Sequence, residues 1–184
     1  MGDCFFETEG LISILNSCEF NITRYREENT ENYDIIIIGL SSEPLLNWGR
    51  NFTRIWKLWY RIGKKSKLLL LVPEALKNIC LPWSVVSGKM DVDELKRFLM
   101  NFFYMIHGGL YKNQEEKLLS KFRRLCHIHS RYEAMKHQSC LSTYYYWVSQ
   151  FSSAFGVQSA HMLSIINYQP LFERVYCEDV IFVD

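Results

Sequence analysis

This sequence lacks the short motifs that mark the common catalytic sites. It has no glycine-rich phosphate loop, no Gly-x-Ser-x-Gly nucleophile elbow and no His-Glu-x-x-His metal motif. A Cys–His nucleophile pair would meet only in the folded chain, and nothing in the sequence supports one. We therefore expect a protein that is not an enzyme and that needs no cofactor.

Long apolar runs and a disulfide framework are absent as well. No stretch reaches the roughly 18 apolar residues that a membrane span needs, and no basic segment followed by an apolar run opens the chain as in a secretory signal. The six cysteines follow no regular spacing. We expect a cytoplasmic protein without membrane contact, whose reduced thiols act as small apolar side chains.

The charge is nearly balanced, so composition gives no strong overall field. The chain has 184 residues, of which 48% are hydrophobic, and its formal net charge is +1. That length suits one large or two small domains with a packed core. The balance is uneven, however. Residues 111–137 hold seven Lys or Arg against three Glu, whereas residues 138–184 hold only Arg174 against four acidic residues.

Three short aliphatic runs predict buried strands at residues 33–39, 67–73 and 83–87. They are continuously apolar and not alternating, which is typical of strands covered on both faces. We therefore expect an α/β unit whose sheet is parallel and has helices on either side.

The segments around these strands predict helices and one further strand. Residues 10–15 belong to an amphipathic helix, and a strand is expected near residues 20–25. Asp91 can cap a helix over residues 92–106. The pair Gly108-Gly109 would end that helix and mark a domain boundary.

The remainder of the chain predicts a small all-α unit. We expect a basic linker helix after residue 110, then helices over residues 144–152 and 157–168. Pro170 would stop the latter, and residues 171–177 would start another helix. The predicted domains are residues 1–107, a linker helix over 108–138, and a helical domain over 139–184.

This order of parts resembles response regulators with a LuxR-type output domain, and more closely their degenerate, RcsA-like branch. Asp3-Cys-Phe-Phe with Glu9-Gly-Leu11 is similar to the segment after the first strand of a receiver domain. Asp34-Ile-Ile-Ile-Ile-Gly39 resembles the third strand. Val86-Ser-Gly-Lys89 followed by Asp93-Glu-Leu95 resembles the fifth strand, its lysine and the last helix. Ser159-Ala-His-Met-Leu-Ser-Ile-Ile166 resembles the LuxR-type recognition helix.

The same resemblance shows where the receiver chemistry is missing. Gly39 stands where the family has its phosphoacceptor aspartate, and a glycine cannot accept a phosphoryl group. Residues 72–73 replace the expected hydroxyl-bearing residue, and Asp3 alone represents the acidic pair that holds magnesium. Lys89 is then expected to be a surface lysine. The first strand is missing, so the sheet would begin with an exposed edge or with a partner's strand.

The recognition-helix resemblance implies a face that reads DNA. The residues expected to face the major groove are Val157, Ser159, Ala160, His161 and Ser164, with Leu163, Ile165 and Ile166 facing the core. The family's lysine after the histidine is Met162 here, and its threonine at the turn is Val157. No Lys or Arg lies between Gln138 and Glu173.

Phosphate contacts must then come from the basic helix upstream, if it folds beside the reading helix. The cations expected there are Lys121, Arg123, Arg124, Arg131 and Lys136. The alternative is a small helical bundle whose serines and histidine lie on a solvated face.

Two further groups of residues allow a functional interpretation. Cys126, His129, His137 and Cys140 form two Cys/His pairs that could bind zinc. The seven-residue gap between the pairs is shorter than common zinc motifs use, so we favour scattered residues and no metal.

Residues 48–67 mix aromatic and basic side chains, as in a membrane-surface helix or a platform for single-stranded nucleic acid. We favour a crossover helix with buried aromatics and outward charges. The best functional alternative is a dimer interface at Trp56, Trp59 and Tyr60.

These patterns lead to two hypotheses. The first is a bacterial-type transcriptional regulator that binds double-stranded DNA as a homodimer or a heterodimer. Partner binding or abundance would control it, and phosphorylation would not. The second is a protein-interaction regulator that heterodimerises with another regulator and does not contact DNA.

Overall fold

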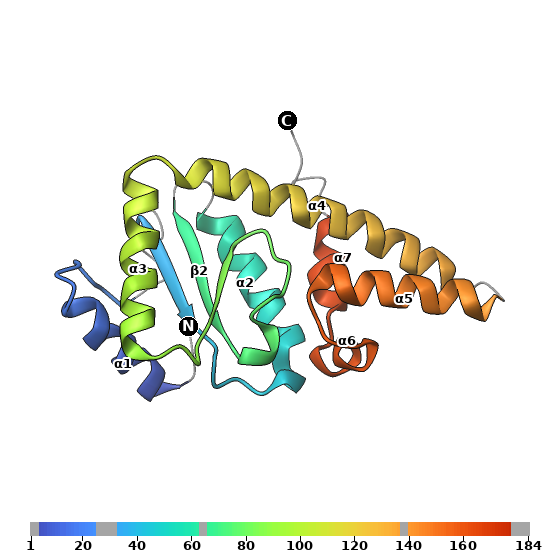
Figure 1. Cartoon of the computed structure of the whole chain (residues 1–184), viewed down its shortest axis with the longest axis horizontal. Coiled ribbons are helices and arrows are strands. Elements are labelled where there is room, and N and C mark those ends of the chain that lie inside the picture. The colour runs from blue at the N-terminus through green and yellow to red at the C-terminus, as the bar shows by residue number, and fades with distance from the viewer. Residues whose placement is uncertain (1–3, 25–32, 63–65, 137–139, 178–184) are drawn as a thin grey trace.

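A computed structural model describes residues 4–24, 33–62, 66–136 and 140–177 and shows a mixed α/β fold (Figure 1). Its elements in chain order are α1 (Phe5–Asn16), β1 (Ile35–Gly39), η2 (Leu45–Asn47), α2 (Trp48–Ile62), β2 (Lys67–Val72), η3 (Glu74–Leu76), β3 (Ser84–Ser87), α3 (Val92–His107), α4 (Tyr111–Met135), α5 (Leu141–Phe155), α6 (Ala160–Ile166) and α7 (Gln169–Cys177).

The three predicted strands form one parallel sheet in the order β1-β2-β3. In this register Ile37 pairs with Leu69, and Leu70 pairs with Val85. The prediction of a parallel sheet from continuous aliphatic runs is therefore confirmed. Among residues 4–24 no strand precedes β1.

The expected strand at residues 20–25 is wrong as far as the structure describes it. Residues 20–24 are irregular, and Tyr25 lies outside the described residues. The Phe20 ring stacks on Phe103 of α3, with ring centroids 3.9 Å apart. The apolar Phe20 ring therefore covers α3 and does not belong to a strand.

Helices cover both faces of the sheet, and the side chains of β2 alternate between the two. Leu68 and Leu70 point into the apolar cluster that contains α2, whereas Leu69 and Leu71 point into the cluster under α1 and α3. All four side chains are buried. A strand buried on both faces explains why the run has no polar residues.

The predicted cap of α3 is confirmed. Asp91 accepts a hydrogen bond from the Glu94 N–H at 2.8 Å, which satisfies one of the free donors of the first turn. The helix ends at His107 with Gly108 as its C-cap, and α4 begins at Tyr111.

The helical half packs directly on the sheet half. Helix α4 crosses one end of the layers and pairs with α5 in a hairpin that projects beyond the body (Figure 1). Helix α7 packs along α2. One apolar cluster contains Trp56 of α2, Phe122 of α4, Phe151 of α5 and Phe172 of α7, so it crosses both predicted domain boundaries.

The third predicted helix is shorter than expected. Helix α6 ends at Ile166 because Asn167 adopts a left-handed conformation, with φ of 48°. Pro170 does not stop it. Pro170 lies in the first turn of α7, where a missing N–H costs nothing.

Candidate nucleic-acid interface

A tight turn at Gly156 joins α5 to α6. Gly156 has φ of 85°, and its N–H donates to the carbonyl oxygens of Ser152 and Ser153, both at 3.1 Å. The Val157 N–H also donates to the Ser152 carbonyl at 3.1 Å. A Cβ at position 156 would lie 1.9 Å from the backbone oxygen of Asn78. Only glycine fits this conformation and this close approach.

Helix α6 is held by a side-chain cap and by two apolar anchors. The Ser159 hydroxyl accepts a hydrogen bond from the Met162 N–H at 3.3 Å. Leu163 and Ile166 are buried in the core, as predicted, whereas Ile165, also expected there, is only partly buried. The helix has seven residues, so it is about 10 Å long. It is thus a short, anchored helix with one face in solvent.

Most of the residues expected to read DNA lie on that solvent face. Ser159, Ala160, His161 and Ser164 are exposed. Val157 is not, because its side chain is only 7% exposed and belongs to the apolar core. The expectation for Val157 is therefore wrong. The left-handed turn at Gly156 directs the next side chain inward.

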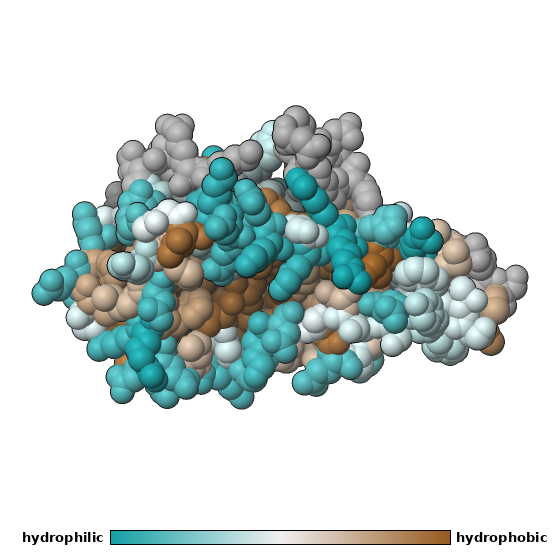
Figure 2. Space-filling model, turned by 45° about the horizontal axis from the view of Figure 1, so that its top comes forward, coloured by the Kyte–Doolittle hydropathy of each residue, from teal (hydrophilic) through white to brown (hydrophobic). Residues whose placement is uncertain are grey.

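The expected phosphate-contacting residues of α4 do not border α6. Lys121, Arg123, Arg124, Arg131 and Lys136 are exposed. Helix α5 lies between α4 and α6 (Figure 1). Figure 2 shows hydrophilic side chains projecting from the face that carries α4. The sequence suggested that α4 would lie beside α6, but α5 packs between the two helices.

A different basic helix lies against α6. A Cβ at Gly49, in the first turn of α2, would lie 2.7 Å from the backbone oxygen of Asn167. Asn167 is the residue that ends α6, and α6 also packs on η2. The residue after Gly49 is Arg50, which is exposed. The start of α2 and the end of α6 therefore lie side by side.

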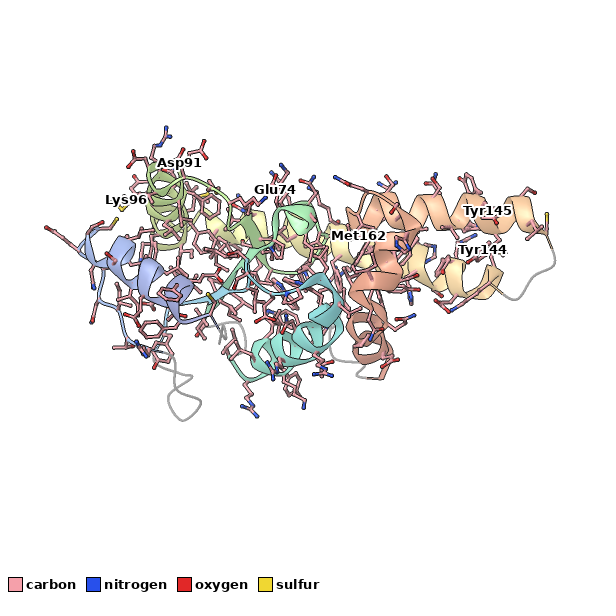
Figure 3. All side chains as sticks on the ribbon, turned by 90° about the horizontal axis from the view of Figure 1, so that it is seen from below. Glu74, Asp91, Lys96, Tyr144, Tyr145 and Met162 are labelled. Carbon is pink, nitrogen blue, oxygen red and sulfur yellow. The ribbon has the colours of Figure 1, made fainter. Side chains whose placement is uncertain are left out.

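The solvent face of α2 carries a line of cations, which we name the α2 basic stripe. Its members are Arg50, Arg54, Lys57 and Arg61, all exposed. Their spacing of four, three and four residues places them on one side of the helix. Nitrogen-tipped side chains project from α2 on the side away from the sheet (Figure 3). This spacing was visible in the sequence, but its place beside α6 was not.

The aromatic residues of α2 mostly face inward. Trp56 is 5% exposed, and its Nε1–H donates to the Leu171 carbonyl at 3.0 Å. The Trp59 ring packs edge-on against Trp56, at 5.0 Å between centroids. Tyr60 is exposed. Trp56 is thus wrong as a dimer contact, since this chain already covers it. Of the three expected contacts, Tyr60 is the one with a mostly exposed side chain.

Glu7 fills the space beside Gly39, the residue that the receiver resemblance would place at a phosphoacceptor position. A Cβ at Gly39 would lie 2.9 Å from the carboxyl carbon of Glu7. The Glu7 carboxylate accepts hydrogen bonds from the Ser41 N–H at 3.1 Å and from the Ser41 hydroxyl at 2.7 Å. The Ser42 hydroxyl donates to its other oxygen at 3.3 Å. The space at the carboxyl end of β1 is therefore occupied by the Glu7 carboxylate.

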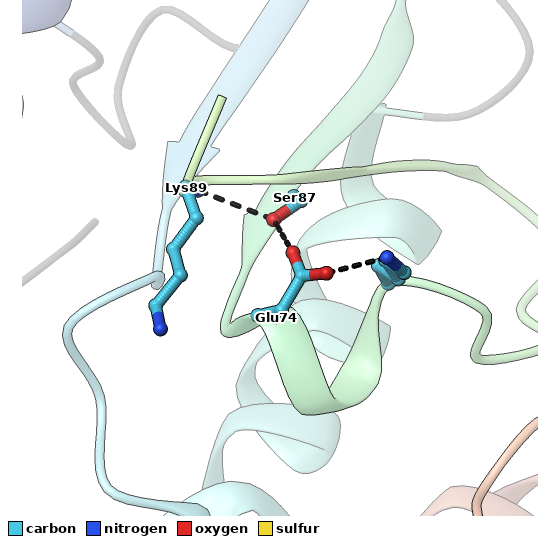
Figure 4. A network of polar contacts seen from close by, with 4 residues as sticks. Glu74, Ser87 and Lys89 are labelled. Carbon is cyan, nitrogen blue, oxygen red and sulfur yellow. Dashed lines mark hydrogen bonds and ion pairs between the residues drawn. The ribbon is translucent and has the colours of Figure 1, made fainter. Parts of the chain in front are cut away.

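A second carboxylate, that of Glu74, lies at the carboxyl end of β3 (Figure 4). Glu74 accepts hydrogen bonds from the Ser87 hydroxyl and the Lys77 ammonium, and both lower its pKa. The Lys89 N–H donates to the Ser87 hydroxyl at 3.2 Å. The Lys89 side chain is exposed and extends away from Glu74 (Figure 4). Asp3 lies outside the described residues.

The proposed zinc ligands are not brought together. Cys126 and His129 are buried, whereas Cys140 is exposed beside the first turn of α5, and His137 lies outside the described residues. Burial raises the pKa of Cys126 to about 12 and lowers that of His129 to about 4. The His129 ring stacks on Phe172 at 4.0 Å between centroids. Within the described ranges no three His, Cys, Asp or Glu residues are placed to share a metal ion.

None of the helices over the described residues combines the length and the apolar character that a membrane crossing requires. Comparison of the chain with protein families, with curated proteins and with solved structures gives no match.

Proposed function

We propose that this chain is a transcriptional regulator that binds double-stranded DNA through α6. The observation that carries the proposal is the outward polar face of α6, with His161 and Ser164 in solvent and Leu163 and Ile166 fixed in the core. A short helix held rigidly after a tight turn is the geometry by which helix-turn-helix proteins present side chains to a groove.

The exposed residues of α6 have suitable chemistry for base edges. The His161 ring and the Ser164 hydroxyl can each donate and accept hydrogen bonds, and the Ala160 methyl can contact a thymine methyl. Each good contact of this kind is worth about 1–3 kcal/mol of discrimination against a wrong base pair. Two such contacts are enough for a measurable sequence preference.

The N-terminal unit would be a receiver-like domain that works without phosphorylation. Gly39 offers no acceptor oxygen, and the Glu7 carboxylate lies in the adjoining space. Control would then come from the abundance of the protein or from its dimerisation with itself or with another regulator.

The experiment that tests this function selects duplexes from a randomised pool with the full chain and then compares two double variants. His161→Ala with Ser164→Ala removes the proposed base contacts. His127→Ala with Ser130→Ala is the matched control, because these exposed residues of α4 have the same types and the same spacing. We expect the α6 variant to lose most of its preference for selected over random duplex, by roughly tenfold or more.

The control variant should keep that preference. Failure of the wild-type chain to enrich any sequence would overturn the proposal, as would equal loss in both variants.

A second candidate function is a regulator that acts by binding another protein. It is favoured by three large apolar or aromatic side chains exposed on the projecting half of α5: Leu141 at 70%, Tyr145 at 65% and Tyr146 at 56%. Figure 3 shows Tyr144 and Tyr145 on this projecting part, away from the sheet. In this case the immobilised full chain would retain another DNA-binding regulator, Tyr145→Ser would weaken the retention, and no duplex would bind.

A further inference from the structure

We infer that the α2 basic stripe holds the phosphate backbone of the duplex that α6 contacts. This inference rests on the proposed function and adds the surface that supplies its affinity. Phosphate contacts provide most of the non-specific affinity of a DNA-binding protein, and α6 has no Lys or Arg of its own. The cations must therefore come from a neighbouring element.

The segment of sequence that contains α2 carries charges of one sign only. No acidic residue occurs from position 44 to position 73, between Glu43 and Glu74. The same span contains seven basic residues, which are Arg50, Arg54, Lys57, Arg61, Lys64, Lys65 and Lys67, and of these Lys67 is ion-paired with Glu115 of α4. In a chain whose net charge is only +1, this concentration makes a local positive field that attracts a polyanion.

The stripe also has the shape of a phosphate-binding surface. From Arg50 to Arg61 the helix rises by about 16 Å, at 1.5 Å per residue. One strand of a duplex advances about 3.4 Å per phosphate, so the stripe can run beside several successive phosphates. Its first member, Arg50, follows the residue that touches Asn167 at the end of α6. The stripe therefore begins beside the end of α6.

The basic face of α4 is a poorer candidate for the same role. Three glutamates, Glu115, Glu116 and Glu133, lie among its cations. The Lys136 ammonium lies 3.7 Å from a carboxylate oxygen of Glu133. In addition, α5 separates this face from α6 (Figure 1).

An anionic membrane surface is a poorer ligand for the stripe than a duplex. Membrane-surface helices insert an apolar face between lipids. The apolar face of α2 is already used, because Phe52, Ile55 and Leu58 are buried in the core. Apart from Tyr60, what α2 offers to a ligand is charge, which suits phosphates in water.

The test compares two charge-matched double variants of the full chain. Arg50→Gln with Lys57→Gln removes two members of the stripe. Lys117→Gln with Arg124→Gln removes one Lys and one Arg, also seven residues apart, from exposed positions on α4. Arg54 and Arg61 are left in place because they also interact within the chain. Circular dichroism checks that each variant keeps the fold.

The readout is the affinity for a labelled mixed-sequence duplex, measured by fluorescence anisotropy over a range of salt concentrations. Each phosphate contact contributes about 0.9 to the slope of log affinity against log salt. The α2 variant should therefore lose about 1.8 from that slope. When the salt rises from ~50 to ~200 mM, the wild type should lose roughly tenfold more affinity for the duplex than the α2 variant does. The α4 variant should keep the wild-type slope.

Other outcomes separate this inference from the proposed function. If the wild type binds and the α2 variant keeps its slope, or the α4 variant loses slope equally, the stripe is not the phosphate surface, while the function of α6 stands. If the α2 variant loses slope while His161→Ala with Ser164→Ala changes no preference, the stripe holds and α6 is not the reader. Binding to phosphatidylserine vesicles but not to duplex, lost in the α2 variant, would overturn the assignment to DNA.

Discussion

The contact between the α5–α6 turn and the segment at Asn78 can be tested by adding one methyl group at Gly156. Two effects add in Gly156→Ala. A non-glycine residue in the left-handed region costs roughly 1–2 kcal/mol. The new Cβ would also lie 1.9 Å from the Asn78 oxygen and 2.6 Å from its carbonyl carbon, so backbone must move. Overpacking of this kind typically costs about 1–3 kcal/mol.

Gly109→Ala is the control that separates the two effects. Gly109 has φ of 73°, but nothing lies within 4 Å of a Cβ built there. It therefore reports the conformational cost alone, which the stiffer unfolded chain partly offsets. We expect Gly156→Ala to lower the free energy of unfolding by about 1–3 kcal/mol more than Gly109→Ala does.

Urea unfolding of both variants, followed by circular dichroism, measures this difference through the shift of the midpoint at constant slope. A difference below ~0.5 kcal/mol, within the spread of ordinary surface substitutions, would refute the close packing of this turn on the sheet half.

Three further predictions concern titration and capping. Burial lowers the pKa of His129 to about 4 from an ordinary 6.5, so the unfolded chain binds the proton at a higher pH than the folded chain does. The free energy of unfolding should therefore fall by ~3 kcal/mol as the pH drops from 6.5 to 4. In a series of urea unfolding curves at decreasing pH, His129→Gln should make this fall smaller. Hydrogen bonds from Ser142 and Thr143 lower the pKa of Cys140 to about 7, so at pH 8 iodoacetamide should alkylate Cys140 well before Cys126, as mass spectrometry would show. Asp91→Ala should cost about 1 kcal/mol in urea unfolding by removing the cap of α3.

The sequence was sufficient for features that depend on local pattern. The aliphatic runs predicted the three strands of the described residues, because a strand buried on both faces consists mainly of apolar residues. Asp91 predicted the start of α3 through its cap, and Gly108 predicted the end of the same helix. Leu163 and Ile166 were correctly placed in the core by helical spacing. In each case the deciding interaction lies within a few residues along the chain.

Features that depend on contacts between distant segments were missed. Val157 is buried because the turn before it packs on Asn78, and no local pattern shows that contact. The basic helix that begins beside the end of α6 is α2, through the approach of Gly49 to Asn167, and the contact between these distant segments could not be seen in the sequence. Sequence spacing shows which residues share a helix face, but not which helix becomes the neighbour.

The shared aromatic cluster limits how this protein can be divided or recombined. Phe151 and Phe172 from the last helices lie in the same apolar cluster as Trp56 of α2, and Trp56 is hydrogen-bonded to Leu171. A graft of residues 139–184 onto another protein would leave those rings without the sheet side of their packing, and such a chimaera should aggregate. The sheet half and the helical half therefore share one core. Substitutions near Trp56 and Trp83 would need compensating substitutions around Phe172 to preserve the packing.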